Sequence, residues 1–154
     1  MGKEDRKLDS VLGAHSLIAV DTPVFIYHFE DNPHYRNLTL SLFEAIETGA
    51  CNAVTSVLSR LEILVRPLQE NRPDIADSYR LLIDTFPNLS QLSIDQEIAD
   101  RAAALRASLG LATPDSIHLA CALTAGATLL VTNDADFSKG EIDDLEVLLL
   151  DSLL

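Results

Sequence analysis

The sequence predicts an α/β protein built on a central parallel sheet. Short apolar runs rich in β-branched residues alternate along the chain with longer segments of helical periodicity. Several of the short runs are apolar on both faces, which is typical of strands buried in a parallel sheet. No linker-like stretch divides the 154 residues, a length that suits one domain. Strands and helices in this order predict parallel pairing with right-handed crossover connections.

The expected strands are five runs of five residues each, most of them apolar. They comprise residues 16–20, 52–56, 90–94, 128–132 and 145–149. Residues 1–10 are mostly polar or charged, and chain ends of this kind are often poorly ordered. We therefore expect a flexible N-terminal tail over 1–10 and one domain over 11–154.

The expected helices are longer segments with apolar residues at helical spacing, namely 35–48, 57–68, 75–86, 95–109 and 114–125. Typical helix-ending residues follow three of them, because Gly49, Gly110 and Gly126 can adopt the left-handed conformation of a helix C-terminus. We expect Thr113 to be the N-cap of the last helix and Pro114 its first residue. A short helix is also expected directly after Asp21.

Composition limits the possible classes of protein. The hydrophobic fraction of 47% excludes a disordered chain. No apolar run reaches the roughly 20 residues that span a bilayer, and the charged N-terminus lacks the apolar core of a secretory signal. We therefore expect a cytoplasmic protein without a membrane partner, in which Cys51 and Cys121 are reduced and buried.

The net charge is strongly negative. Eleven basic and 24 acidic residues give a formal charge of -13. Such a surface repels nucleic acid as a whole and favours cationic ligands or basic protein partners.

Two acids directly follow expected strands. Asp21 comes after the strand over 16–20, and Asp134 comes after the strand over 128–132. The carboxyl ends of parallel strands meet at one edge of the sheet, where ligands bind in open α/β folds. We therefore expect both carboxylates at the same edge.

Two further acids lie on helices next to these strands. Asp115 is in the first turn of the expected helix over 114–125, and Glu62 borders the apolar stripe of the helix over 57–68. Each has an ordinary structural explanation. Asp115 can interact with the helix dipole, and Glu62 can pair with Arg66 one turn later.

Together, the four acids predict a metal site. Carboxylates brought close together repel one another unless a cation lies between them. Mg²⁺ prefers oxygen ligands, and a pair of such ions can activate water and stabilise the leaving oxygen of a phosphodiester. The residues therefore predict a Mg²⁺ or Mn²⁺ site for phosphoryl transfer. No serine or cysteine lies in sequence with a base, so no covalent intermediate is expected.

The stretches that contain these acids resemble the PIN domain family, and most closely its VapC-type toxins. The matching segments are VDTPVFIYHFE, TSVLSRLE, ATPDSIHLACAL and LLVTNDADF, in the order and at the spacing of the family. The resemblance covers residues 16 to 149. It implies a PIN-like three-layer α/β/α sandwich with a parallel five-stranded sheet, and ribonuclease activity on single-stranded RNA with Mg²⁺ or Mn²⁺. It also implies a toxin–antitoxin system, with a cognate antitoxin and a homodimer.

The resemblance assigns roles to individual residues. The acids that it implies to be catalytic and to hold the metal are Asp21, Glu62, Asp115 and Asp134. The residues that it places around them are Asp136, as an outer fifth acid, and the polar Thr22, Thr132 and Asn133. Arg60 and Arg66 flank Glu62 and are candidates for substrate contact, and His118 is expected to pack or to support the site.

Other readings remain beside the nuclease. The acidic surface departs from many family toxins and motivates a catalytically weak PIN-fold protein-interaction module. A phospho-acceptor receiver domain needs an acidic pair at its first strand, whereas Asp21 stands alone. A haloacid-dehalogenase-like phosphatase needs Asp-x-Asp, which the segment from Asp21 to Pro23 does not supply.

Overall fold

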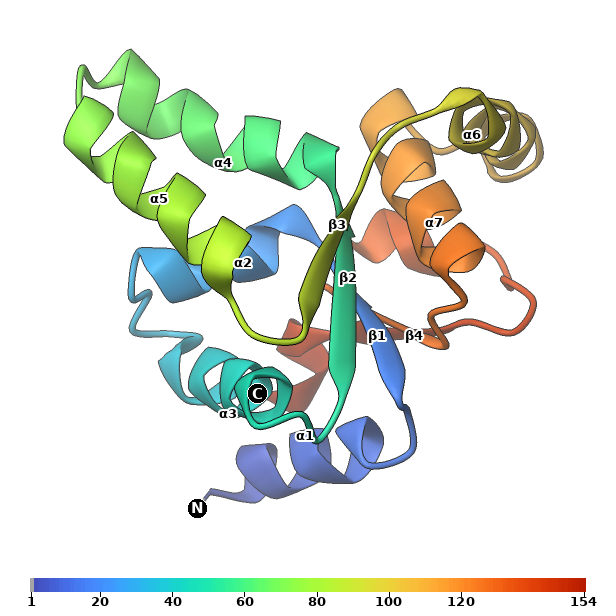
Figure 1. Ribbon diagram of the computed structural model, residues 1–154. Coiled ribbons are helices and arrows are strands. Elements are labelled where there is room, and N and C mark those ends of the chain that lie inside the picture. The colour runs from blue at the N-terminus through green and yellow to red at the C-terminus, as the bar shows by residue number, and fades with distance from the viewer. Residues whose placement is uncertain (1) are drawn as a thin grey trace.

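A five-stranded parallel sheet forms the centre of the computed structural model, which describes residues 2–154 (Figure 1). Each neighbouring pair of strands is parallel, and the order across the sheet is β3-β2-β1-β4-β5. The strands are β1 (Leu17–Val20), β2 (Asn52–Ser56), β3 (Leu89–Leu92), β4 (Leu129–Thr132) and β5 (Glu146–Leu149). The predicted three-layer α/β/α fold is confirmed.

Seven helices and two 3₁₀ turns surround the sheet in the described residues. They are α1 (Lys3–Leu12), α2 (Thr22–Phe29), α3 (Arg36–Glu47), α4 (Val57–Gln69), α5 (Pro73–Thr85), α6 (Gln96–Leu109), α7 (Thr113–Ala125), η1 (Ala135–Ser138) and η2 (Leu150–Leu153). The bounds of the predicted strands and helices agree with the observed ones to within two residues at either end. None of the helices in the described part of the chain is long and apolar enough to cross a membrane.

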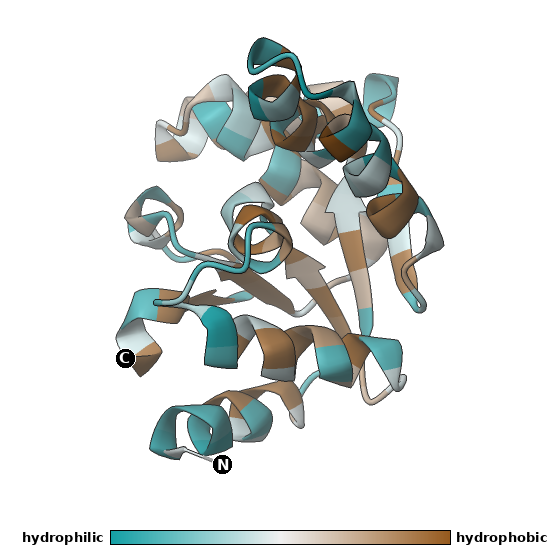
Figure 2. Ribbon diagram, turned by 90° about the vertical axis from the view of Figure 1, so that its left-hand side faces the viewer, coloured by the Kyte–Doolittle hydropathy of each residue, from teal (hydrophilic) through white to brown (hydrophobic). Residues whose placement is uncertain are grey.

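The alternation of side chains along the strands divides the core into two parts. Ile18 and Val20 of β1 pack with buried residues of α1, α2 and α3, whereas Ala19 packs on the opposite face with Leu119 of α7. In Figure 2 the strands carry much of the brown colour, while the outer turns of the N-terminal helix are teal. The α4–α5 pair extends beyond the carboxyl end of β2, and the Ser56 hydroxyl caps α4 by accepting a hydrogen bond from the Leu58 amide (2.9 Å) (Figure 1).

The N-terminal segment differs from the flexible tail expected over residues 1–10. Lys3–Leu12 form a helix, in which Leu8 is completely buried and Leu12 is 4% exposed. The two leucines are four residues apart and therefore lie on one face of the helix, against the core that α3 and η2 help to form. The neighbouring residues are mostly charged, so the two leucines are not recognisable as an apolar stripe in the sequence.

The start of α7 corrects one predicted cap. Thr113 is the first helical residue and Ala112 is the N-cap, without a side-chain hydrogen bond. The proline that follows is tolerated because the first turn of a helix does not need its amide. Gly110 and Gly126 have the predicted left-handed conformation at the ends of α6 and α7.

The burial of α1 can be tested by shortening one leucine. We predict that Leu8→Ala lowers the free energy of unfolding by about 2–5 kcal/mol, because it leaves a cavity in the core. Leu40→Ala is the matched control, since Leu40 is a helical leucine that is 53% exposed; its effect should stay below about 0.5 kcal/mol. Urea unfolding measures both. If Leu8→Ala lowers the free energy of unfolding no more than the control does, α1 does not belong to the core.

Candidate metal centre

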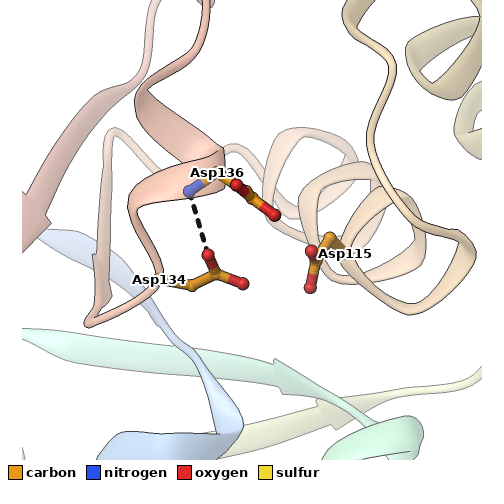
Figure 3. Close-up of side chains that lie close together, drawn as sticks. All are labelled: Asp115, Asp134 and Asp136. Atoms are coloured by element: carbon orange, nitrogen blue, oxygen red, sulfur yellow. Dashed lines mark hydrogen bonds between the residues drawn. The ribbon is translucent and has the colours of Figure 1, made fainter.

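Three carboxylates converge beyond the carboxyl end of β4. Asp115 comes from the first turn of α7, Asp134 from the residues just after β4, and Asp136 from η1. One oxygen of each lies within 4.8 Å of the others, and Figure 3 shows the three side chains around a common space. We call these three residues the carboxylate cluster. Asp136, which the sequence analysis treats as an outer acid, is thus a full member of the tightest group.

Local hydrogen bonds orient Asp134 and Asp136. The Asp134 amide donates to the Thr132 hydroxyl (3.1 Å), and the Asp134 carboxylate accepts from the Asp136 amide (2.9 Å) (Figure 3). These bonds turn the chain sharply at the end of β4. Asp134 and Asp136, two residues apart, therefore face Asp115 together.

Asp21 is buried next to the cluster. It is 4% exposed, and its two oxygens accept hydrogen bonds from the Thr22 amide (2.9 Å) and the Thr132 hydroxyl (2.7 Å). Burial raises the pKa of this carboxyl, although the nearby His118, Thr132 and Thr22 oppose the rise, and the charge of Glu62 adds to it. Thr132 therefore contacts both acids that end the two neighbouring strands.

Glu62 reaches the same edge from α4. Its Oε1 atom accepts hydrogen bonds from the Thr22 hydroxyl (2.9 Å) and from Nε2 of His118 (2.6 Å), and that nitrogen is 3.9 Å from Asp21. Burial opposes ionisation of Glu62, but the hydrogen bond and charge of His118 outweigh it and lower the pKa of the carboxyl. Burial likewise opposes the charge on His118, but Glu62 and Asp21 raise the pKa of the imidazole. The geometry therefore favours a carboxylate–imidazolium pair.

Two buried hydroxyls that the sequence analysis missed support this arrangement. Ser59 lies 3.0 Å from the Thr22 hydroxyl and 2.8 Å from the Thr55 hydroxyl, which also donates to the Val20 carbonyl (3.0 Å). The available signal was a run of small hydroxyl residues, Thr55, Ser56 and Ser59, at the junction of strand and helix. These linked hydroxyls fix the orientation of the Thr22 side chain, whose hydroxyl in turn holds the Glu62 carboxylate in place.

Asn133 has a different role from its neighbours. Its side-chain amide donates to the hydroxyls of Tyr35 (2.9 Å) and Tyr27 (3.3 Å), and its carbonyl accepts from the Asp151 amide (2.9 Å). It thus ties the residues after β4 to α2, to the start of α3 and to η2. Its hydrogen bonds do not involve the carboxylate cluster.

The two arginines predicted to contact substrate are held by other acids. Arg60 forms an ion pair with Asp84 of α5. Arg66 pairs with Glu70 (3.0 Å) and with Glu30 (3.4 Å). Neither arginine contacts the carboxylate cluster through these bonds.

The residues present fit a divalent cation. Burial, followed by the charges of Asp134 and Asp21, raises the pKa of Asp115 to about 6, and His118 lowers it only in part. Negative charge is therefore in excess at this point of the structure. Because all donors in the cluster are carboxylate oxygens, they suit hard ions such as Mg²⁺ or Mn²⁺. Asp115, Asp134 and Asp136 would hold the ion, with Asp21 and Glu62 beside it.

The raised pKa of Asp115, caused first by burial and then by the neighbouring acids, predicts an unusual pH dependence of stability. The Asp115 pKa is higher in the folded protein than in the unfolded chain, so the folded state takes up a proton as the pH falls through about 6. We predict that Asp115→Asn raises the free energy of unfolding of the metal-free protein by about 1–2 kcal/mol at pH 7.5. The gain should shrink as the pH approaches 4.5. Urea unfolding at several pH values with a chelator tests this, and a destabilised variant at pH 7.5 would contradict it.

Comparisons with known proteins agree with this geometry. The PIN domain family matches residues 18–142, a segment that contains Asp21, Glu62 and the carboxylate cluster. A search of curated proteins gave no match. A toxin–antitoxin complex from Klebsiella pneumoniae is 24% identical over 86% of this chain and 97% of the other, with a TM-score of 0.64.

A second similar structure is that of VapBC2 from Rickettsia felis bound to a DNA fragment from its promoter. It is 16% identical, covers 86% of this chain and 97% of the other, and has a TM-score of 0.68. At these identities both likenesses show the shared fold. The family match spans most of the chain and includes the strands and helices that bring the acids together. The chain therefore belongs to the PIN domain family.

Proposed function

We propose that this protein is an endoribonuclease that cleaves single-stranded RNA with Mg²⁺ or Mn²⁺. The observation that carries the proposal is the carboxylate cluster beside Asp21 and Glu62, at the carboxyl edge of the sheet of a PIN domain. Metal-dependent hydrolysis of a phosphodiester uses a site that binds divalent cations and positions a water, and this set of oxygen ligands suits both tasks.

The roles of the individual residues follow from their contacts. The bound cation would supply charge stabilisation and lower the pKa of a bound water. Asp115, Asp134 and Asp136 would hold it, and the hydrogen bonds of Thr132 and Thr22 keep Asp21 oriented toward the same space.

Glu62 is suited to orient a metal-bound water. Both of its side-chain hydrogen bonds in the described structure use Oε1, and its side chain is 35% exposed. Its lowered pKa keeps it ionised near neutral pH. Oε2 is therefore the oxygen that can accept a hydrogen bond from a metal-bound water and orient it.

We further propose that the protein is the cytoplasmic toxin of a type II toxin–antitoxin pair and forms a homodimer. The two similar structures are, by their titles, a toxin–antitoxin complex and VapBC2 bound to promoter DNA. A surface for a protein partner is also available, because five large apolar side chains are at least 42% exposed on the α4–α5 pair: Leu61, Val65, Leu68, Leu81 and Leu82.

The alternative is a PIN-fold interaction module with little catalytic activity. The net charge of -13 and the ion pairs that hold Arg60 and Arg66 favour it, because both weaken the attraction for RNA. The two functions differ in whether the metal-bound protein cleaves RNA. A nuclease cleaves RNA with Mn²⁺, whereas a module binds metal without turnover.

Metal binding is expected to stabilise the folded protein. An ion that binds only the folded state raises the melting temperature by mass action. Millimolar Mn²⁺ should therefore raise the melting temperature of the wild type, while Asp21→Asn or Asp115→Asn should lose most of that increase. Asp100→Asn, an exposed acid on α6, is the control and should respond like the wild type. An equal response in all proteins would exclude a shared metal site.

Cleavage depends on the same acids. We predict that Asp21→Asn and Asp115→Asn each lower RNA turnover by about 100-fold or more, because the amide keeps the shape but removes a unit of negative charge. His118→Ala should retain most of the activity if its packing survives, and Asp100→Asn should be unaffected. The assay is turnover of single-stranded RNA with Mn²⁺ and a chelator control.

Two results would change the conclusion. Full cleavage by Asp21→Asn would refute the mechanism. Wild-type protein that binds Mn²⁺ but cuts none of a broad RNA panel would favour the interaction module.

A further inference from the structure

One lysine lies at the rim of the carboxylate cluster. Lys139 follows η1, and its Nζ atom is 3.1 Å from an oxygen of Asp136. Within residues 2–154, this is the only ion pair between a lysine or arginine and a member of the cluster. Lys139 thus places an ammonium group beside the proposed catalytic site.

The other basic side chains are engaged elsewhere or lie on another element. Five arginines pair with acids outside the cluster: Arg36, Arg60, Arg66, Arg72 and Arg80. Arg101 and Arg106 of α6 donate to Thr124 and to the Leu111 carbonyl. Lys3, Arg6 and Lys7 belong to α1, which leads into the amino end of β1 (Figure 1). Lys139 is therefore the cation best placed to meet an anion at the cluster.

The contribution of this ion pair to stability gives little reason for the lysine. Both partners are about half exposed, and such pairs contribute about 0.2–1 kcal/mol at most. Lys139 instead offsets part of the negative charge of the cluster. A divalent cation attracted by the same carboxylates would repel the ammonium group, and the flexible stem of a lysine allows that group to move to another anion close by.

We propose that Lys139 binds a phosphate oxygen of the RNA. It pairs with Asp136 in the metal-free protein and contacts a non-bridging oxygen of the phosphodiester when metal and substrate are bound. The proposal rests on the ribonuclease function proposed above and names a substrate contact in place of the paired Arg60 and Arg66. It also explains how a protein with a net charge of -13 can attract a polyanion at this one point.

If Lys139 has this role, Lys139→Gln should strengthen the binding of Mn²⁺ and weaken the binding of RNA. The variant loses a positive charge that competes for Asp136, so the metal-free protein should bind Mn²⁺ about 2- to 5-fold more tightly. It also loses one phosphate contact, so KM for RNA should rise several-fold, while kcat changes by less than about 2-fold. The slope of log affinity against log salt should fall by about 0.7, the value for one phosphate on a single strand. A purely structural lysine would not strengthen one affinity while weakening the other.

The experiment compares four proteins. They are the wild type, Lys139→Gln, Lys139→Arg, and Lys7→Gln as a lysine control on α1. Electron paramagnetic resonance of free Mn²⁺ gives the metal affinity without RNA, and steady-state cleavage of single-stranded RNA over a range of salt gives KM and kcat. We expect Lys139→Arg to keep KM within about 2-fold of the wild type because it retains the charge. Lys7→Gln should match the wild type in both measurements.

The failures of the two proposals are distinguishable. Unchanged KM and salt slope in a Lys139→Gln protein that cleaves RNA would overturn the role of Lys139 and leave the nuclease standing. Weaker Mn²⁺ binding by that variant would also overturn it. Wild-type and Lys7→Gln proteins that bind Mn²⁺ but cleave no RNA would overturn both proposals.

Discussion

The register between β1 and β4 determines the geometry of the site. Val20 pairs with Val131 in the parallel ladder, so Asp21 emerges beside Thr132 at the end of the sheet. The Thr132 hydroxyl donates to the Asp21 carboxylate and accepts from the Asp134 amide, which joins the two strand ends through one oxygen. A shift of one residue would turn Asp21 toward the opposite face, because side chains alternate along a strand. The apolar pairing of the two strands therefore fixes the acids at one edge.

Sequence reasoning succeeded where the determinants are local and failed where they are distant in the chain. The strands and helices follow from periodicity, and the acids could be located because each lies just after a strand or on a helix next to one. The support of the site could not be found in this way. Ser59 meets Thr22 across 37 positions, and Asn133 binds the Asp151 amide across 18. In α1, Leu8 gains its role only because the core lies beneath it.

Two basic groups compensate different acids of the site. His118 lies against Glu62 and Asp21, the acids outside the carboxylate cluster, and Lys139 lies against Asp136. Within residues 2–154, no ion pair reaches Asp115 or Asp134. Burial, followed by the charges of the neighbouring acids, raises the pKa of Asp115 to about 6. The uncompensated charge is thus concentrated where Asp115 and Asp134 face each other, the place at which a divalent cation would relieve the most repulsion.

An acidic surface is compatible with RNA cleavage if attraction is confined to the site. A polyanion is repelled by most of a protein with a net charge of -13, which suppresses the non-specific binding that basic nucleases gain from their surface. Each divalent ion at the cluster reverses two units of that charge locally, and Lys139 adds one more beside it. Affinity then depends on a bound metal to a greater degree than in a basic nuclease. The same acidic surface would attract a basic protein partner, so the charge that weakens contact with RNA can strengthen contact with a regulator.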